Sequence, residues 1–218
     1  MNLYILKIPK KIMWNKLEKY VCYISKERTK KIEKYISNHS KITSLLTEIF
    51  LRYCLTCFHN VKIGDIKFVY NENQKPSIIG KENLYFSISH SCNIIGIAVN
   101  DHPIGLDLEV ERIINLDIAK ELYSSEECCQ IFKRGNNNIY KDFFKMWTQK
   151  ESRLKLFGES FLSLIEKAPR NKCVTQTFYC DIDTSNIIIS TSSKNKNLNI
   201  NIQKLSFENV LENVQNIR

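Results

Sequence analysis

Long apolar runs are absent from this 218-residue sequence, and its first residues lack the features of a secretory leader. No stretch approaches the ~20 consecutive apolar residues that a membrane-spanning helix needs. Residues 1–7 lack the basic segment, the long apolar core and the small-residue cleavage site of a signal peptide. We therefore expect a cytoplasmic protein without a membrane partner, and an opening strand at residues 3–8.

A second closely spaced pair of cysteines is also absent. Of the eight cysteines, Cys54 and Cys57 form a CxxC pair, but no second pair with the spacing of metal ligands follows. These two cysteines fall inside an apolar helical pattern, where a free cysteine behaves as a small hydrophobic residue. A cytoplasmic chain of this length does not need a disulfide framework either. We expect free thiols.

Acidic residues are fewer than basic ones, 23 against 32, and the formal net charge of +9 favours an anionic partner. Charge alone does not choose among nucleic acid, a membrane surface, a polyphosphate ligand and an acidic protein. A nucleic-acid-binding domain would interleave aromatic and basic residues on one surface. The aromatic residues here fall mostly at helix-core spacing, so we expect no nucleic-acid partner.

The clearest break in the chain is the polar segment that ends at Pro103, because proline resists both a helix interior and a central strand. We place the boundary between two halves there, at residues 1–102 and 103–218. In the first half the patterns predict strands at 3–8, 66–70, 84–89 and 94–99 and helices at 14–24, 26–37 and 40–53. In the second half they predict strands at 104–109, 173–180, 186–190 and 198–203, helices at 115–122, 125–133 and 139–157, and a polar loop at 134–138. Each half therefore combines helices with a small, mostly antiparallel sheet, which is the α+β class.

The helix expected at 139–157 carries a carboxylate on a face that is otherwise apolar. Phe143, Trp147, Glu151 and Lys155 recur every four residues and so share that face. A glutamate beside two aromatic rings is costly to desolvate unless a cation holds it. One interpretation is an exposed i,i+4 ion pair between Glu151 and Lys155, worth a few tenths of a kcal/mol. The other is a functional carboxylate.

Two further carboxylates, Asp107 and Glu109, alternate with Leu108 on the strand expected at 104–109, so they point from the same face. Such a pair repels itself unless a cation lies between the two groups. A solvent-facing strand edge is the alternative interpretation. Together with Glu151, the pair supplies three carboxylates of the kind that bind Mg²⁺. Lys150 and Lys155 would add positive charge for a bound pyrophosphate.

Three short blocks of sequence appear in order: residues 86–91 (Phe-Ser-Ile-Ser-His-Ser), 105–109 (Gly-Leu-Asp-Leu-Glu) and 147–155 (Trp-x-x-Lys-Glu-Ser-x-x-Lys). Separately they are unspecific, and His90 in a polar turn is as compatible with a structural role as with a phosphate contact. Jointly they resemble the 4′-phosphopantetheinyl transferases, in particular the larger, surfactin-synthetase-associated type. The likeness includes the Lys75-Pro76 pair and spans roughly residues 25–165.

The resemblance implies an enzyme of two pseudo-twofold-related α+β halves, with coenzyme A bound in the cleft between them. It implies that Mg²⁺, with Mn²⁺ as an alternative ion, is held by Asp107, Glu109 and Glu151. The residues that it implies for contact with coenzyme A are Arg28, Lys31, Lys75, Pro76, Ser89, His90, Lys150 and Lys155. Among these, Arg28, Lys31 and Lys75 would lie near the adenosine 3′-phosphate, although a basic run such as residues 26–31 is also typical of a solvated helix face.

The reaction implied is attack of a carrier-protein serine on the β-phosphorus of coenzyme A, with 3′,5′-ADP as the leaving group. Lys155 would neutralise charge on the pyrophosphate, and a carboxylate would take the serine proton. The resemblance offers both Glu151 and Glu127 for that base. Glu127 has a second interpretation, because Ser124 and Glu127 have the spacing of a helix capping box.

Two positions depart from the family pattern, both at the nucleotide end. Thr43 stands near an expected arginine, and Gln74 stands where glycine is usual before Lys-Pro.

The partner is expected to be an acyl or peptidyl carrier protein, in fatty-acid, polyketide or nonribosomal-peptide synthesis, and the chain is expected to be a monomer. Residues 110–135 are a candidate docking surface, with Leu116, Ile118, Leu122 and Tyr123 as either contact or core residues. The alternative functions are a Mg²⁺-dependent phosphodiesterase and a nucleic-acid-binding domain.

Overall fold

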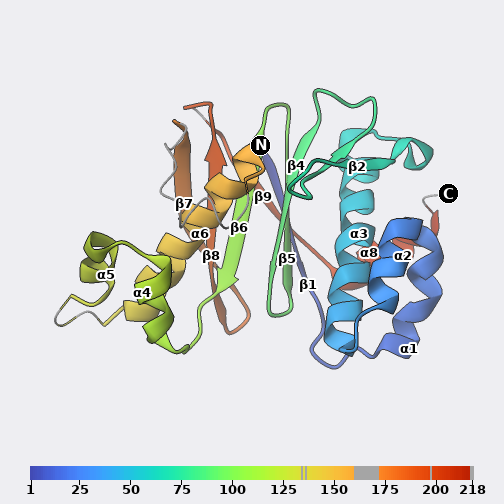
Figure 1. Ribbon diagram of the computed structural model, residues 1–218. Helices are drawn as coiled ribbons and strands as arrows, with labels where there is room; N and C mark the ends of the chain where they lie inside the picture. The colour runs from blue at the N-terminus through green and yellow to red at the C-terminus, as the bar shows by residue number, and fades with distance from the viewer. Residues whose placement is uncertain (134, 136, 160–171, 197, 217–218) are drawn as a thin grey trace.

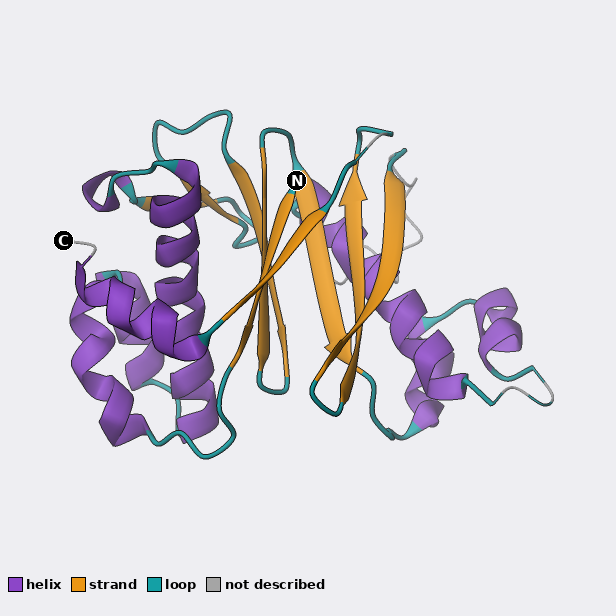
Figure 2. Ribbon diagram, turned by 180° about the vertical axis from the view of Figure 1, so that it is seen from behind, coloured by secondary structure: helices purple, strands orange, loops and turns teal. Residues whose placement is uncertain are grey.

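The computed structural model describes residues 1–133, 135, 137–159, 172–196 and 198–216. Two groups of helices lie at the outer sides of the molecule, with two sheets between them (Figure 1). The view from behind shows the same order of layers, helices, sheet, sheet and helices (Figure 2). The α+β class with small, mostly antiparallel sheets is confirmed.

The first sheet has the strand order β4-β5-β1-β9. Its strands are β1 (Asn2–Lys7), β4 (Tyr85–Ser91), β5 (Ile94–Asn100) and β9 (Asn201–Leu205). Neighbouring strands run antiparallel except β1 and β9, which are parallel. The helices on its outer face are α1 (Trp14–Leu17), α2 (Lys26–Glu33) and α3 (Asn38–His59), with a 3₁₀ segment at Glu18–Tyr23. A separate pair, β2 (Phe68–Tyr70) and β3 (Pro76–Ile78), follows a 3₁₀ turn at Ile63–Asp65.

The second sheet has the order β6-β8-β7 and is antiparallel throughout. Its strands are β6 (Ile104–Val110), β7 (Val174–Ile182) and β8 (Ser185–Ser193). The long helix α6 (Ile139–Phe157) covers its outer face, and beside α6 lie α4 (Ala119–Leu122), α5 (Ser125–Ile131) and a 3₁₀ turn at Leu116–Ile118.

The two sheets pack face to face, so the central strands are buried on both sides. In β1, Tyr4 and Leu6 pack toward α3, whereas Leu3 and Ile5 pack against Leu106 and Leu108 of β6. Successive side chains of a strand point to opposite faces. Burial of both faces therefore gives β1 and β5 nearly continuous apolar sequences.

The chain ends in a helix, α8 (Phe207–Asn216), which the sequence analysis did not predict. Phe207, Val210, Leu211 and Val214 have helical spacing and join the core on the α3 side of the first sheet. Ser206 Oγ accepts a hydrogen bond from the backbone N–H of Asn209, as a helix N-cap does. The prediction that strands finish the chain was therefore wrong, although the apolar spacing and the cap were both readable.

Other predicted elements differ mainly at their ends. The helix expected at 26–37 stops at Glu33, the one expected at 125–133 stops at Ile131, and the last strand begins at Asn201 rather than at residue 198. Residues 134 and 136 of the expected loop lie outside the described residues. The division at residue 102 stays a prediction of domain organisation, and the C-terminal β9 and α8 pack with the first sheet and α3.

All eight cysteines are free thiols, with Cys54 buried inside α3. Among the described residues, no helix is both long and apolar enough to cross a membrane.

Candidate functional site

Three serines join the edges of the two sheets, where β4 lies beside β6. Serines at alternate positions of β4 face β6 and accept hydrogen bonds from its backbone N–H groups: Ser87 from Leu106 at 2.9 Å, Ser89 from Leu108 at 3.2 Å and Ser91 from Val110 at 3.2 Å. These hydroxyls satisfy donors that a neighbouring strand would otherwise satisfy. The Ser-Ile-Ser-His-Ser block therefore sets the position of the second sheet against the first.

The same hydroxyls hold the two carboxylates of β6. Ser89 Oγ donates to Asp107 Oδ1 at 2.7 Å, and Ser91 Oγ donates to Glu109 Oε2. Asp107 is only 4% exposed, and among the described residues its Oδ2 atom is buried without a hydrogen-bond partner. An unpartnered buried carboxylate oxygen is costly. This oxygen is therefore an acceptor suited to a donor or a cation.

Helix α6 brings Lys155 and Glu151 to this strand. Lys155 Nζ lies 2.7 Å from Asp107 Oδ1 and 3.1 Å from Ser89 Oγ. Burial raises the pKa of Glu151, and the negative charge of Asp107 raises it further, against the opposing effect of Lys155. The interpretation as an isolated surface pair of Glu151 and Lys155 is therefore wrong, because Lys155 pairs across the fold with Asp107.

Arg112 also belongs to the site, although the sequence analysis did not single it out. Its Nη1 atom donates to Glu109 Oε2 at 2.8 Å and to Ser91 Oγ at 3.3 Å. Its guanidinium lies 4.8 Å from the ring centroid of Phe144. The i,i+3 spacing from Glu109 was a signal, but many exposed pairs have that spacing.

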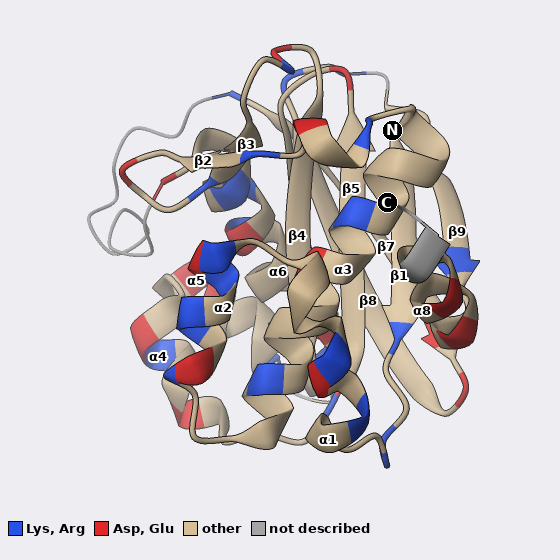
Figure 3. Ribbon diagram, turned by 90° about the vertical axis from the view of Figure 1, so that its right-hand side faces the viewer, with Lys and Arg blue, Asp and Glu red and all other residues tan. Residues whose placement is uncertain are grey.

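One cavity of about 830 Å³ brings together side chains from both halves of the chain. It is lined by ten of the predicted site residues, Arg28, Lys31, Lys75, Pro76, Ser89, His90, Asp107, Glu109, Glu151 and Lys155. Trp147 and Thr47 also line it. Basic residues recur along α2, which carries Arg28 and Lys31 (Figure 3). Carboxylates and basic groups therefore line the same cavity.

His90 opens toward this cavity from β4. His90 is exposed, yet the surrounding protein partly desolvates its ring and so lowers its pKa. The positive charge of Lys155 lowers this pKa further. A ring so placed can donate or accept a hydrogen bond at neutral pH.

The loop between β2 and β3 ties the first half to the end of α6. Lys75 Nζ donates to the carbonyl oxygen of Leu156 at 2.8 Å, and Asn73 Nδ2 donates to that of Gly158 at 2.7 Å. Burial lowers the pKa of Lys75 from 10.5 to about 8. Gln74 between them has φ of 62°, a left-handed conformation in which glycine is less strained. This explains the family preference for glycine there.

Two predicted site residues do not line the cavity. Lys150 is 9% exposed and donates to Glu127 Oε2 at 2.7 Å and to the carbonyl oxygen of Leu122 at 3.0 Å. Glu127 also closes the capping box of α5 with Ser124. Neighbouring residues on a helix differ by about 100° in direction. Lys150 therefore points to α5 while Glu151 points to the cavity.

The candidate docking residues mostly belong to the core beside α6. Tyr123 is buried and donates to the carbonyl oxygen of Phe143 at 2.8 Å, and Leu116 and Leu122 pack against the same cluster. Ile118 is the exposed member, at 46%.

No group of three or more His, Cys, Asp or Glu side chains in the described part of the chain is gathered as a metal site. Instead, Asp107 is engaged by Lys155 and Glu109 by Arg112. The oxygen donors and the unpartnered Asp107 Oδ2 nevertheless suit a hard divalent cation. The metal ligands stay a prediction.

Comparison with known proteins finds one family. The model of the 4′-phosphopantetheinyl transferase superfamily matches residues 103–202. The 4′-phosphopantetheinyl transferase gsp of Aneurinibacillus migulanus is 30% identical over 154 residues, which cover 71% of this chain and 64% of that protein. The 4′-phosphopantetheinyl transferase Sfp of Bacillus subtilis (strain 168) is 26% identical over 159 residues, 73% of this chain and 71% of that protein. The 4′-phosphopantetheinyl transferase psf-1 of Bacillus pumilus is 24% identical over 217 residues, 92% of each chain. The match to gsp thus spans slightly less than two thirds of its length.

Proposed function

We infer that the chain belongs to the 4′-phosphopantetheinyl transferase superfamily, and from this premise we propose that it transfers 4′-phosphopantetheine from coenzyme A to a serine of an apo carrier protein. The P–O bond to the 3′,5′-ADP leaving group breaks as the serine oxygen bonds to the β-phosphorus. The observation that carries the proposal is a cavity lined by Asp107, Glu109 and Glu151 together with Lys155 and basic residues of the first half.

We propose that Asp107, Glu109 and Glu151 hold a divalent ion, Mg²⁺ or Mn²⁺, when coenzyme A is bound. Such an ion would supply charge neutralisation at the pyrophosphate. The support is the donor set and the buried Asp107 Oδ2 atom, which lacks a partner among the described residues. Ser89 and Ser91 orient the two β6 carboxylates through their hydroxyls.

Lys155 is proposed to stabilise charge on the leaving group. Its ammonium already lies in the cavity, held by Asp107 and Ser89, so little reorganisation is needed when the pyrophosphate gains charge. His90, Lys31, Arg28 and Lys75 would surround the other phosphates of coenzyme A, since all four line the same cavity.

We propose that Glu151 is the general base that accepts the proton of the attacking serine. This carboxylate faces the cavity, where a carrier serine would have to enter to reach the pyrophosphate. Glu127 is the alternative base, but it caps α5 and pairs with Lys150, and it does not line the cavity.

The partner would be an acyl or peptidyl carrier protein. The net charge of +9 suits an acidic carrier, because opposite charges speed association. We further propose a cytoplasmic monomer: the eight free thiols suit a reducing compartment, and the cavity is complete within one chain.

The proposed transfer is tested by incubating the protein with Mg²⁺, coenzyme A and an apo carrier protein. Mass spectrometry of the carrier is expected to show the gain of one phosphopantetheine group, on a serine and with equimolar release of 3′,5′-ADP. Both fatty-acid and peptide-synthetase carriers should be assayed. Turnover of simple phosphodiesters without a carrier, and no gain on any carrier, would favour a Mg²⁺-dependent phosphodiesterase instead.

Affinity for 3′,5′-ADP is expected to fall as the pH rises through about 8. Lys75 is charged below its lowered pKa and neutral above it, so a contact with the phosphate is lost as the pH increases. The phosphate itself, with a second pKa of about 6, stays doubly charged over this range. Loss of one charge-assisted contact corresponds to about a tenfold change in Kd. Bound phosphate raises the pKa of Lys75, so the midpoint in the complex lies above that of the free protein.

Calorimetric titration with 3′,5′-ADP between about pH 7 and pH 10 covers the ionisation of Lys75 and so measures this effect. The matched variant Lys75→Gln should bind more weakly at the lower pH and show a flatter profile. Equal pH profiles for the two proteins would mean that Lys75 makes no phosphate contact.

A further inference from the structure

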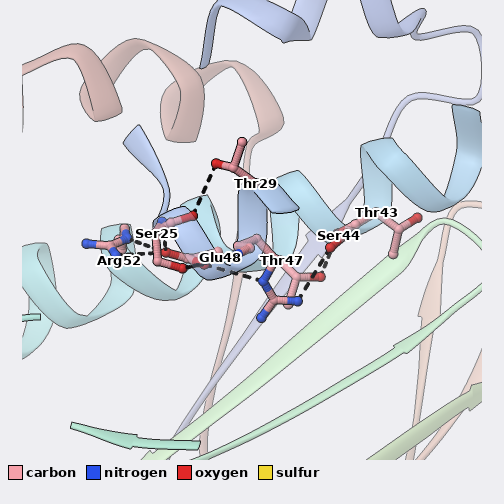
Figure 4. Close-up of polar contacts among 8 residues, drawn as sticks. Ser25, Thr29, Thr43, Ser44, Thr47, Glu48 and Arg52 are labelled. Atoms are coloured by element: carbon pink, nitrogen blue, oxygen red, sulfur yellow. Dashed lines mark hydrogen bonds and ion pairs between the residues drawn. The ribbon is translucent and has the colours of Figure 1, made fainter. Parts of the chain in front are cut away.

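A buried carboxylate outside the predicted site lies behind the basic wall of the cavity. Glu48 of α3 is 1% exposed. Its Oε1 atom accepts from Arg52 Nε at 2.9 Å and Nη2 at 2.7 Å (Figure 4). Its Oε2 atom accepts from Arg28 Nε at 3.3 Å. One carboxylate thus serves two guanidinium groups, and these ion pairs offset the cost of burying it.

Glu48 also holds the start of α2. The backbone N–H of Ser25 donates to Glu48 Oε1 at 2.6 Å, and Ser25 Oγ donates to Oε2 at 2.9 Å. Ser25 is the N-cap of α2, because its Oγ accepts from the backbone N–H of Arg28 at 3.2 Å. This carboxylate therefore helps to anchor on α3 the helix that carries Arg28 and Lys31 into the cavity wall.

The two arginines that share Glu48 differ in what they face. Arg28 lines the cavity, whereas Arg52 does not, and Arg52 lies 5.3 Å from the ring centroid of Phe68. The Arg28 side chain donates two hydrogen bonds to α3. Its Nε atom donates to Glu48, and its Nη1 atom makes a long hydrogen bond of 3.5 Å to Ser44 Oγ. No contact within the described residues engages its Nη2 atom. A guanidinium held in this way presents its remaining donors in a fixed direction.

We propose that Glu48 is a positioning residue for the nucleotide end of coenzyme A. It orients the Arg28 guanidinium and the first turn of α2 toward the cavity, so that their positive charge meets a phosphate without further ordering. The inference rests on the proposed function in one respect, namely that the cavity binds a nucleotide phosphate.

The direction in which Glu48→Gln changes the affinity for 3′,5′-ADP separates a positioning role from a purely electrostatic effect of Glu48. Glu48 is a negative charge near an anion site, so its removal alone would tighten anion binding. If Glu48 positions Arg28, the Glu48→Gln variant should instead bind 3′,5′-ADP about tenfold more weakly, the scale of one charge-assisted contact. It should also raise KM for coenzyme A more than it lowers kcat, since the reacting phosphorus lies elsewhere in the cavity.

The matched control is Arg52→Met, which removes a partner of the same carboxylate without altering the cavity wall. Both variants are expected to lower the melting temperature, but Arg52→Met should leave the Kd of 3′,5′-ADP within about twofold. Arg28→Lys keeps the charge and loses the Nε donor, so it should weaken binding as Glu48→Gln does. Combining Arg28→Lys with Glu48→Gln should then cost little more than either change alone, because the two residues act as one unit. If Glu48→Gln does not fold, Arg28→Lys and Arg52→Met alone still test the prediction.

Calorimetric titration of purified full-length protein with 3′,5′-ADP decides among the outcomes. Tighter or unchanged binding by Glu48→Gln, or full additivity with Arg28→Lys, would overturn the positioning role. Equal losses of affinity for 3′,5′-ADP in Glu48→Gln and Arg52→Met would also overturn it, because they would indicate that the cluster is purely structural. If Glu48→Gln does not fold, unchanged binding by Arg28→Lys overturns the role. Wild-type protein that binds neither 3′,5′-ADP nor coenzyme A would instead contradict the proposed function, and the positioning role with it.

Discussion

Replacement of Glu151 by glutamine is expected to lower kcat for phosphopantetheine transfer by about 10²- to 10⁴-fold, the range for removal of a general base. Glutamine keeps the size of the side chain but accepts no proton from the serine. Burial and the nearby Asp107 raise the pKa of Glu151, against the opposing effect of Lys155. Removal of its charge should leave the packing of α6 beside Trp147 intact.

Transfer measured by carrier mass, over a range of Mg²⁺ concentrations, separates the two roles proposed for Glu151. A ligand role alone predicts that Glu151→Gln regains its kcat at high Mg²⁺, whereas a base role predicts that kcat stays low at saturation. Glu127→Gln is the matched control. It breaks the capping box and the pair with Lys150, so it should cost about 1 kcal/mol of stability with a small change in kcat. The reverse pattern would assign the base to Glu127.

Gly105→Ala is expected to cost about 3 kcal/mol or to prevent folding, although it adds a single methyl group. A Cβ atom at this position would lie 1.8 Å from the carbonyl oxygen of Ser152 and 2.5 Å from the backbone nitrogen of Leu156. Both neighbours are backbone atoms of α6, so no side chain can move to make room. Relief requires α6 to shift away from β6, which would separate Glu151 and Lys155 from Asp107 and Glu109.

Thermal unfolding and transfer activity together test this prediction. Gly64→Ala is the control, because a Cβ atom there meets nothing within 4 Å and its backbone φ is not left-handed. It should leave both stability and activity nearly unchanged. A Gly105→Ala protein with wild-type stability and kcat would contradict the close contact of β6 and α6.

Much of the site was predictable because its chemistry is concentrated in three short blocks. Asp107 and Glu109 alternate with apolar residues on a strand, and Glu151 and Lys155 are one helical turn apart, so their faces follow from local geometry. Lys75 and His90 line the same cavity, and the roles that the resemblance gives to these residues stay predictions. Arg112 and Glu48 were not predicted, because their roles depend on partners from other elements.

The sequence by itself determined the α+β class, the helix at 139–157, the strands of both sheets to within a few residues, and the resemblance to one family. Apolar spacing and motif residues are local properties, and they are present before the chain folds. Only the tertiary structure decided that Lys150 pairs with Glu127 while Lys155 pairs with Asp107. It also decided that α8 returns to α3, and that a buried Glu48 stands behind Arg28. These outcomes depend on contacts between elements far apart in the chain. Burial and charge pairing in the folded protein decide which partners meet, and the local sequence does not contain that information.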